Sequence, residues 1–322
     1  MEPDLSIVIV SWNVRDLLKA CLESIQSGPV MIIPAGEDST PGQGLGVEVI
    51  VVDSGSSDGS PQMVRERFSW VKLIEPGYNV GFSKGNNIGL EASRGRYVFF
   101  LNPDTKVLGG ALPRMIAYMD THPEVGALGP QLLNADGSVQ SSRRRFPTLW
   151  TAFFEATWLE PTAPPGVIQH FRMLDCSDEK ILDVDWVTGA ALLVRRRVIE
   201  QVGGMDEGFF MYSEELDWQR RIKAAGWHIV YYPEAKIIHY GGKSSEQATA
   251  RRDIHFNTSK VRYYRKYHGP LVASALRAFL LADYTCQLML EGAKWLLGHK
   301  PELRRERVRT YWQVIRSGLR EQ

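Results

Sequence analysis

The sequence predicts an α/β protein in which helices cover both faces of a mostly parallel central sheet. Three observations support this fold class. Short apolar segments alternate with segments of helical periodicity over roughly the first 240 residues. Residues 5–10 are predicted to form a strand, and residues 47–52 are too apolar to have a solvent-exposed face, as expected of a strand covered on both sides. Both segments end in short stretches rich in Ser, Asn, Asp or Gly, which are typical of turns.

The individual elements follow from periodicity and from the residues that end each segment. Strands are expected at residues 5–10, 47–52, 71–74, 97–101, 125–129, 184–195, 228–232 and 235–238. Helices are expected at residues 14–26, from about residue 60, at the end of the segment 79–90, and at 111–121 and 214–225.

Composition narrows the class of protein. The chain has 322 residues, of which 44% are hydrophobic, enough for a full core. The cysteines Cys21, Cys176 and Cys286 form neither a disulfide framework nor a zinc-binding spacing, which predicts a reducing compartment. The N-terminus lacks the basic region of a signal peptide. No run of about 18 apolar residues occurs, so no transmembrane segment is expected.

A domain boundary is expected near residue 250, with residues 1–250 as the α/β domain and 251–322 as a helical extension. The extension holds 15 Lys or Arg residues against 6 Asp or Glu, whereas residues 1–250 hold 23 against 31. Residues 271–297 are helical, with their polar side chains gathered within about 120° of the helical wheel. A basic, amphipathic extension favours peripheral contact with an anionic membrane surface. A helical cap or a homodimer element is the alternative.

The segment Tyr97–Leu101 and the turn after it form the centre of the predicted sheet. Asn102-Pro103-Asp104 follows, and Pro103 cannot donate to a strand ladder. Asp104 therefore lies just beyond the carboxyl end of a strand, where open α/β sheets bind ligands. A carboxylate there can bridge a divalent cation to a diphosphate. The alternative is an ordinary turn in which Asp104 caps the next segment.

Other acidic residues follow the same logic. Asp53 ends a second predicted strand, and Glu214, Glu215 and Asp217 open a predicted helix. If the strands are parallel, Asp53 and Asp104 lie at the same edge of the sheet. One can contact a base or ribose and the other a metal-bound diphosphate, while an acid of the helix serves as general base for an attacking hydroxyl. Helix capping by Asp53 and a solvated first-turn Glu215 are the alternatives.

Three further features have both functional and structural interpretations. The run Arg143-Arg144-Arg145 is expected to be exposed, either contacting an acceptor phosphate or simply solvated. Trp186 and Trp218 could stack on sugar rings, although core packing is the commoner role of Trp. Arg221 is expected to pair with the neighbouring acids.

Six motifs occur in an order that resembles the family 2 glycosyltransferases, and most closely their bacterial rhamnosyltransferase branch. The motifs are SWN at 11–13, VVDSGSSDG at 51–59, NVGFSKGNN at 79–87, LNPD at 101–104, FFMYSEELDW at 209–218 and HYGG at 239–242. The resemblance spans roughly residues 5–245. It implies a GT-A fold, a nucleotide-sugar donor, a divalent metal (Mg²⁺ or Mn²⁺) and inversion at the anomeric carbon.

The resemblance also implies roles for particular residues. Asp53 would accept a hydrogen bond from the pyrimidine N3–H. Asp104 would hold the metal, His239 would be a further metal ligand, and Glu215 would be the general base. Residues that would line the nucleotide, the diphosphate and the sugar are Ser11, Asn13, Asn79, Gly81, Asn86 and Asn102.

Two departures from the family pattern bear on these roles. Asn102 replaces the first Asp of the family's Asp-x-Asp motif, so metal binding rests on fewer charges. The base position holds Glu rather than Asp, one methylene longer, which leaves Glu214 and Asp217 as alternatives. For His239 the alternative is a histidine whose hydrogen bonds are satisfied at a strand end.

The resemblance implies dTDP-L-rhamnose as donor and, as acceptor, a polyprenyl-diphosphate-linked saccharide or a growing polysaccharide. The transfer reaction would take place in the cytoplasm, at the inner face of the cell membrane. No nucleic-acid partner is expected. The alternatives are the same chemistry with a UDP-hexose donor, a sugar-nucleotide-binding protein without turnover, and a nucleotidyltransferase.

Overall fold

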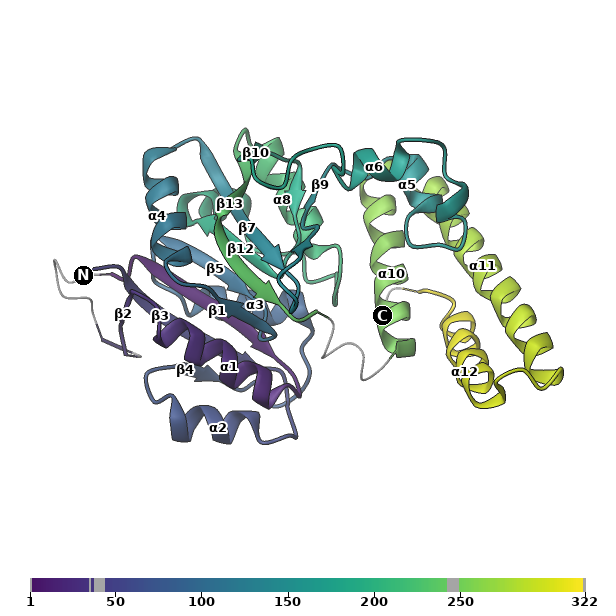
Figure 1. The fold of residues 1–322 in the computed structure, drawn as a ribbon, viewed down its shortest axis with the longest axis horizontal. Coiled ribbons are helices and arrows are strands. Elements are labelled where there is room, and N and C mark those ends of the chain that lie inside the picture. Colours follow the sequence, from purple (N-terminus) through teal and green to yellow (C-terminus); the bar gives the residue numbers. More distant parts are fainter. Residues whose placement is uncertain (1, 35, 38–43, 242–248, 321–322) are drawn as a thin grey trace. The chain divides into compact units, whose positions relative to one another are not determined.

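The computed structural model describes residues 2–34, 36–37, 44–241 and 249–320. The chain divides into two compact units (Figure 1). The sheet unit comprises Met1–Phe146, Arg172–Glu207 and Glu214–Ser244. The helical unit comprises Pro147–Phe171, Gly208–Ser213 and Ser245–Gln322. Two stretches from earlier in the chain therefore belong with the C-terminal helices.

The sheet unit is built on one mixed sheet in the order β10-β13-β7-β12-β5-β1-β3-β2, with β4 beside β3, β6 beside β13 and β8 beside β7. β1 is parallel to both β3 and β5, as predicted, whereas β12 is antiparallel to β5 and β7. The strands are β1 (Leu5–Ser11), β2 (Met31–Ile32), β3 (Gly46–Asp53), β4 (Lys72–Ile74), β5 (Tyr97–Leu101), β6 (Thr105–Val107), β7 (Val125–Leu133), β8 (Val139–Gln140), β10 (Leu182–Asp183), β12 (Ala191–Arg195) and β13 (His228–His239). A separate two-stranded sheet pairs β9 (Arg143–Arg144) with β11 (Trp186–Val187).

Helices cover both faces of the main sheet and enclose two hydrophobic clusters. On one face, Ile7 and Ile9 pack in a cluster that includes side chains of α1, α2 and α4. On the other face, Val8 and Phe100 pack with α8 and α7, and α3 lies against the same cluster. Alternate residues of β1 thus point to opposite clusters, as the pleat of a strand requires. The helices are α1 (Arg15–Gln26), α2 (Ser60–Arg67), α3 (Phe82–Glu91), α4 (Ala111–Thr121), α7 (Arg196–Val202) and α8 (Glu214–Ala224).

Two strand predictions are corrected. The segment 184–195 is not one strand, because residues 188–190 turn between β11 and β12. Residues 228–239 form the single strand β13, in which the register shifts between Tyr232 and Lys236 accommodate the Pro233–Glu234 step.

The predicted exposure of the arginine run is wrong at Arg143. Its side chain is only 2% exposed and is paired with Asp178. The guanidinium also donates to the carbonyl oxygens of Cys176, at 2.6 Å, and Met173, at 3.2 Å. Since Arg143 lies on β9, where side chains alternate between faces, it turns inward and stabilises the segment 173–178.

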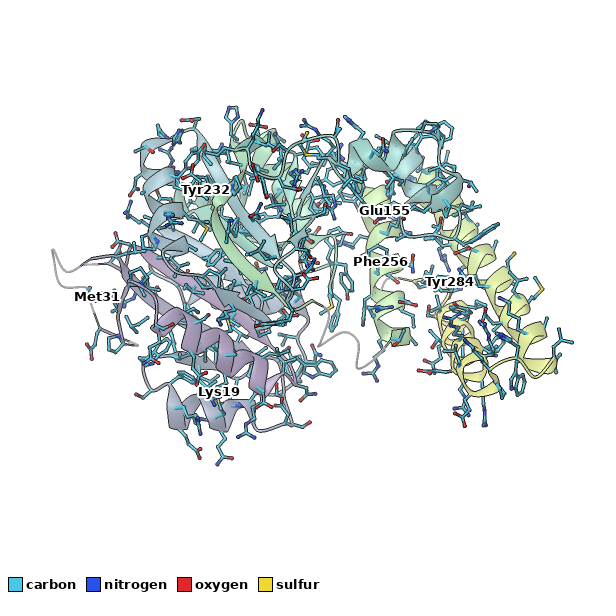
Figure 2. The ribbon with its side chains drawn as sticks, viewed as in Figure 1. Lys19, Met31, Glu155, Tyr232, Phe256 and Tyr284 are labelled. Carbon is cyan, nitrogen blue, oxygen red and sulfur yellow. The ribbon has the colours of Figure 1, made fainter. Side chains whose placement is uncertain are left out.

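The helical unit consists of α5 (Leu149–Phe154), the short 3₁₀ helix η1 (Glu160–Thr162), α6 (Val167–Phe171), α10 (Thr249–His268), α11 (Pro270–Leu296) and α12 (Pro301–Ser317). Figure 2 marks Glu155, Phe256 and Tyr284 in this unit. Glu155 pairs with the buried Lys260, whose pKa is lowered by burial. Arg304 of α12 forms an ion pair with Glu291 of α11. Of the helices in the described ranges, none combines the length and apolarity needed to cross a bilayer.

Candidate active site

Three neighbouring strands end in polar residues at one edge of the sheet. β3, β1 and β5 are adjacent and parallel, so Asp53, Ser11 and Asn102 follow one another along that edge. Ser11 and Asp53 are direct register partners. Each residue has a buried side-chain oxygen without a hydrogen-bond partner among the described residues: Asp53 Oδ2, Ser11 Oγ and Asn102 Oδ1. Buried polar atoms of this kind are rare in proteins and often mark a binding site.

The turn after Asp53 is held by hydrogen bonds from a second loop. Asp53 Oδ1 accepts from the backbone N–H of Ser56 at 2.8 Å. The Ser54 hydroxyl accepts from Val80 N at 2.9 Å and donates to Asn79 Oδ1 at 3.2 Å. Asn79 Oδ1 also accepts from Gly81 N at 3.0 Å. The predicted residues Asn79 and Gly81 are therefore brought next to the Asp53 turn.

Asn13 joins two loops at this edge, whereas Asn86 forms its hydrogen bond within α3. Asn13 has a left-handed backbone with φ of 52°, and its Oδ1 accepts from Ser57 N at 2.8 Å. Its own N–H donates to Ser56 Oγ at 2.9 Å, which joins the loops after β1 and β3. Asn86 is buried in α3 and donates to Phe82 O at 3.0 Å.

The Asn102-Pro103-Asp104 turn is closed by the residue after it. The Thr105 hydroxyl donates to Asn102 O at 2.7 Å. The Cys21 sulfur lies 3.5 Å from Thr105 Oγ1, and burial raises the pKa of its thiol to about 12. Cys21 is therefore a protonated packing residue beneath the turn rather than a nucleophile.

His239 and Asp104 form a pair of candidate cation ligands. Nε2 of His239 lies 3.4 Å from Oδ1 of the buried Asp104, and Tyr240 N donates to Asp104 O at 2.9 Å. Nδ1 of His239 lies 2.7 Å from Gln140 Oε1. Since that amide oxygen can only accept, Nδ1 carries a proton, and Nε2 is the ring nitrogen that faces Asp104. Nε2 can donate to the carboxylate when it carries a proton, and when it does not, the nitrogen and the carboxylate oxygen can ligate one cation.

Asp104 and His239 are two candidate ligands rather than a full ligand set. In the residues that the structure describes, no group of three or more His, Cys, Asp or Glu side chains could hold a metal ion. Gly242, the last residue of the HYGG motif, lies outside the described residues.

Glu215 contacts Gly189, which lies just before β12 at the same edge of the sheet. Gly189 N lies 3.4 Å from Glu215 Oε1, and a Cβ on Gly189 would be 3.3 Å from Glu215 Cβ and Cγ. The next residue, Ala190, accepts from Asn102 N at 2.9 Å. The base candidate therefore lies across residues 189–190, which contact the turn that carries Asp104. Gly189 permits this close approach because it has no side chain.

Two reciprocal bonds fix α8 in this position. The Gln219 amide accepts from Val187 N at 2.8 Å and donates to Val187 O at 2.7 Å. Trp218 is fully buried, packs edge-on against Phe100 and donates to Gly203 O. The core role of Trp218 is confirmed, and the helix that carries the acids is held against the sheet.

The other two acids of α8 differ from Glu215. Asp217 is fully buried and accepts from Arg221 Nε at 3.1 Å, as predicted for Arg221. Arg221 also donates to the carbonyl oxygens of Val202 and Gly204, so this ion pair fixes a loop. The pKa of Glu214 is raised well above 4.5, first by burial and then by the charge of Glu215. Burial thus favours the neutral form of Glu214, and Asp217 is held in an ion pair.

Sequence reasoning missed four residues that position the site: Ser54, Gln140, Gly189 and Gln219. Ser54 directly follows the predicted Asp53, but the partners of Ser54 and Gly189 are distant in the chain. Nothing in the local sequence indicates the contacts of Gln140 or Gln219.

Comparison with known proteins agrees with this geometry. Residues 6–182 match the family described as Glycosyl transferase family 2, and residues 97–300 match Glycosyl transferase family group 2. The chain belongs to glycosyl transferase family 2. It is therefore a glycosyltransferase enzyme, and the resemblance seen in the six motifs is confirmed.

Two relatives of this glycosyltransferase are bacterial rhamnosyltransferases. It is 34% identical over 214 residues to the N-acetylglucosaminyl-diphospho-decaprenol L-rhamnosyltransferase of Mycobacterium tuberculosis, covering 62% of this chain and 68% of the relative. It is 27% identical over 256 residues to the rhamnosyltransferase WbbL of Escherichia coli, covering 73% of this chain and 82% of the relative.

Solved structures of similar fold confirm the GT-A prediction. The mannosyltransferase PcManGT of Pyrobaculum calidifontis, in complex with GDP-Man and Mn²⁺, superposes with a TM-score of 0.53 at 17% identity, covering 98% of this chain and 86% of that chain. GalNAc-T7 with UDP, GalNAc and Mn²⁺ gives a TM-score of 0.52 at 15% identity, covering 73% of this chain and 42% of that chain.

The raised pKa of Glu214 predicts a pH-dependent stability difference. The folded state holds a proton that the unfolded state releases above 4.5, so the contribution of Glu214 to stability falls as pH rises through this range. The isosteric, neutral Glu214→Gln should gain melting temperature relative to wild type between about pH 5 and about pH 8. Thermal unfolding across this range measures the effect. Glu91→Gln, an exposed control, should show no such trend. A melting-temperature difference between Glu214→Gln and wild type that does not change with pH would refute the raised pKa of Glu214.

Proposed function

We propose that this glycosyltransferase moves L-rhamnose from dTDP-L-rhamnose, with inversion, to a hydroxyl of a polyprenyl-diphosphate-linked saccharide. The observation that carries the proposal is the convergence of Asp53, Asp104 and Glu215 on one edge of the sheet. The names of the two rhamnosyltransferase relatives support the donor sugar. The acceptor is supported by the first of them, which acts on an N-acetylglucosaminyl diphospholipid by name.

The nucleotide would bind at the ends of β3 and β1. Asp53 has one carboxylate oxygen held by Ser56 N and the other without a partner among the described residues. That second oxygen can accept from the N3–H of a pyrimidine base, and Ser11 Oγ beside it can donate or accept. The loop of Asn79 and Gly81, fixed against Ser54, would follow the diphosphate and the sugar.

A divalent metal fits the residues at the end of β5. Asp104 Oδ1 and His239 Nε2 lie 3.4 Å apart, and Asn102 Oδ1 is buried without a partner in the described part of the chain. Hard cations prefer oxygen donors such as those of Asp104 and Asn102, and the hydrogen bond between His239 Nδ1 and Gln140 Oε1 would orient the imidazole. When bound, Mg²⁺ or Mn²⁺ would offset the charge that develops on the leaving diphosphate. The diphosphate and water would supply the remaining ligands.

Glu215 would act as the general base. Its carboxylate would accept the proton of the acceptor hydroxyl as that oxygen forms a bond to the anomeric carbon. The bond between the anomeric carbon and the diphosphate oxygen breaks on the opposite face, which inverts the configuration. Glu214, kept neutral by burial and by the charge of Glu215, leaves the negative charge of this pair on Glu215.

The helical unit would bind the surface of an anionic membrane. Large apolar side chains are exposed where α11 ends, with Leu296 82% and Leu297 84% exposed. The exposed bases Lys300 and Arg305 follow within the same turn and the start of α12. Apolar side chains flanked by Lys and Arg are typical of interfacial membrane contact, which would bring the enzyme to a lipid-linked acceptor.

Replacing the base should remove turnover but not donor binding. Glu215→Gln is expected to lower the rate of dTDP release from dTDP-L-rhamnose by about 10²- to 10⁴-fold, because Gln cannot accept the proton. Release is measured with N-acetylglucosaminyl-diphospho-polyprenol as acceptor and a panel of UDP-hexoses as rival donors. Glu91→Gln is the matched control and should keep its rate. Normal turnover of Glu215→Gln would indicate that Glu214 or Asp217 is the general base. Faster release of UDP from a UDP-hexose than of dTDP from dTDP-L-rhamnose would indicate that the UDP-hexose is the donor.

Chelation should stop the reaction. Treatment with EDTA is expected to abolish dTDP release, and added Mn²⁺ or Mg²⁺ should restore it. Asp104→Asn, which keeps the shape of the side chain but removes its charge, should raise the metal concentration needed for half-maximal rate. Release that is unaffected by chelation would remove the metal from the mechanism.

Membrane contact can be tested with matched leucine variants. The double variant Leu296→Ser and Leu297→Ser should reduce co-sedimentation with vesicles containing anionic phosphatidylglycerol at least about tenfold, because each buried Leu contributes roughly 1.5–3 kcal/mol. Leu271→Ser is the control, since Leu271 is 85% exposed but lies at the opposite end of the 27-residue α11. Equal binding by the double variant and the control would contradict the proposed contact.

A further inference from the structure

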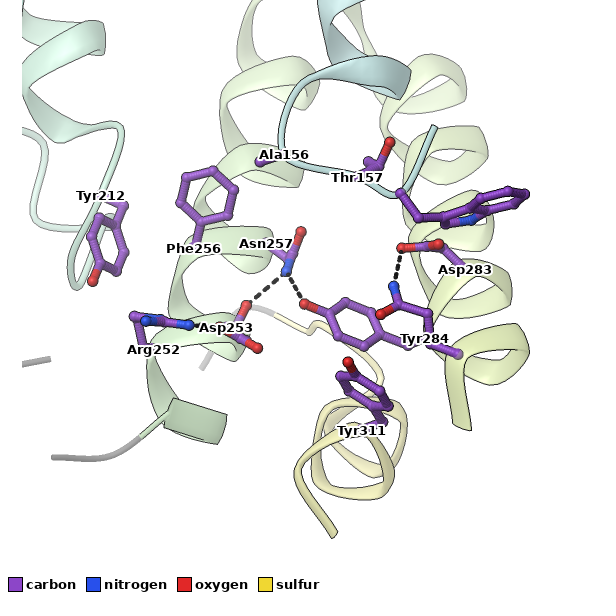
Figure 3. Close-up of a pocket in the computed structure, with 12 residues that line it drawn as sticks. Ala156, Thr157, Tyr212, Arg252, Asp253, Phe256, Asn257, Asp283, Tyr284 and Tyr311 are labelled. Atoms are coloured by element: carbon purple, nitrogen blue, oxygen red, sulfur yellow. Dashed lines mark hydrogen bonds and ion pairs between the residues drawn. The ribbon is translucent and has the colours of Figure 1, made fainter. Parts of the chain in front are cut away.

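A pocket of about 450 Å³ lies wholly within the helical unit. It is lined from α10 by Phe256 and Asn257, from α11 by Asp283 and Tyr284, and from α12 by Tyr311 (Figure 3). The remaining lining residues are 156–158, Tyr212, Arg252, Asp253 and Gln287. This volume is within the range of sites that bind small organic ligands.

The pocket has a polar acceptor that nothing in the described residues satisfies. Asp283 is only 6% exposed, and its Oδ2 accepts from Gln287 Nε2 at 3.0 Å. Its Oδ1 has no hydrogen-bond partner among the described residues. Leaving a buried carboxylate oxygen without a partner destabilises a fold, so such a group is expected where a ligand completes the bond.

Other polar groups of the pocket are held in fixed positions. Asn257 Nδ2 donates to Asp253 O at 2.8 Å and to Tyr284 Oη at 3.1 Å. Tyr284 packs edge-on against Tyr311, with ring centroids 5.6 Å apart. The rings and hydroxyls are therefore positioned in advance, which lowers the entropic cost of binding a ligand.

The charge of the pocket favours a neutral ligand over a cation. Asp253 is paired with Arg252, at 3.1 Å, and the charge of Lys260 acts on Asp283. Burial raises the pKa of both carboxyl groups, which also lessens their negative charge. Aromatic walls combined with compensated carboxylates and amides suit a ligand that has hydroxyl donors and an apolar face.

We propose that this pocket binds a sugar ring. A ring hydroxyl would donate to Asp283 Oδ1, a second would exchange hydrogen bonds with Tyr284 Oη, and the C–H face of the ring would pack on Trp158 or Tyr311. The proposal does not depend on the catalytic assignment at the sheet edge, because all the residues that carry it belong to the helical unit.

The test uses the full chain and ligand-observed saturation-transfer NMR. The probes are methyl α-L-rhamnopyranoside and methyl N-acetyl-β-D-glucosaminide, with saturating dTDP present. Saturable binding of one of them is expected, and Asp283→Ala should weaken it at least about tenfold, a loss of roughly 1.4 kcal/mol. Trp158→Ala should weaken it as well, while Trp312→Ala, a similarly exposed Trp of the same unit that does not line the pocket, should leave it unchanged.

Thermal unfolding and a catalytic variant complete the design. Asp283→Ala should keep one cooperative thermal transition, because the substitution removes one hydrogen bond, from Gln287 to Oδ2, together with an oxygen, Oδ1, that has no partner among the described residues. Glu215→Gln should bind the glycoside like wild type. The proposal would be overturned if the wild type showed no saturable binding. It would also be overturned if Asp283→Ala and Trp158→Ala bound the glycoside as tightly as wild type, or if Glu215→Gln lost binding. Displacement of the glycoside by an equal concentration of spermidine would show selection of a cation and overturn it too.

Discussion

Parallel pairing of β3, β1 and β5 is the constraint on which the rest of the sheet unit depends. Because these strands run in the same direction and Ser11 is in register with Asp53, their carboxyl ends meet at one edge. The antiparallel β12 begins at that edge and brings residues 189–190 to it. β13 ends there and brings His239 beside Asp104. Acids that are far apart in the chain converge because the ladder fixes where every strand begins and ends.

The same edge collects polar atoms that destabilise the folded state. Oxygens of Asp53, Ser11 and Asn102 are buried without partners in the described residues, and Glu214 is buried beside Glu215. A sheet whose strands are covered on both faces by apolar clusters can tolerate this loss. Loops that are cross-linked by their own side chains keep the polar atoms in place. Stability and function thus depend on different parts of the same strands.

The helical unit combines two surfaces of different chemistry. Its pocket is lined by aromatic rings and by carboxylates near positive charges, and Oδ1 of Asp283 has no hydrogen-bond partner among the described residues. The turn between α11 and α12 exposes Leu296 and Leu297 instead. A sugar ring suits the first surface and a lipid headgroup region suits the second, and a lipid-linked saccharide contains both chemistries.

The sequence by itself determined the fold class, because alternating apolar and amphipathic segments admit few architectures. It also predicted α4 at its observed bounds and placed Asp53 and Asp104 at strand ends, since both facts are local. Only the tertiary structure decided that Arg143 is buried, that Gln140 orients His239 and that Gly189 lies against Glu215. These contacts join residues 26 to 99 positions apart in the chain. The periodicity of apolar residues indicates local structure but not which distant side chains come into contact.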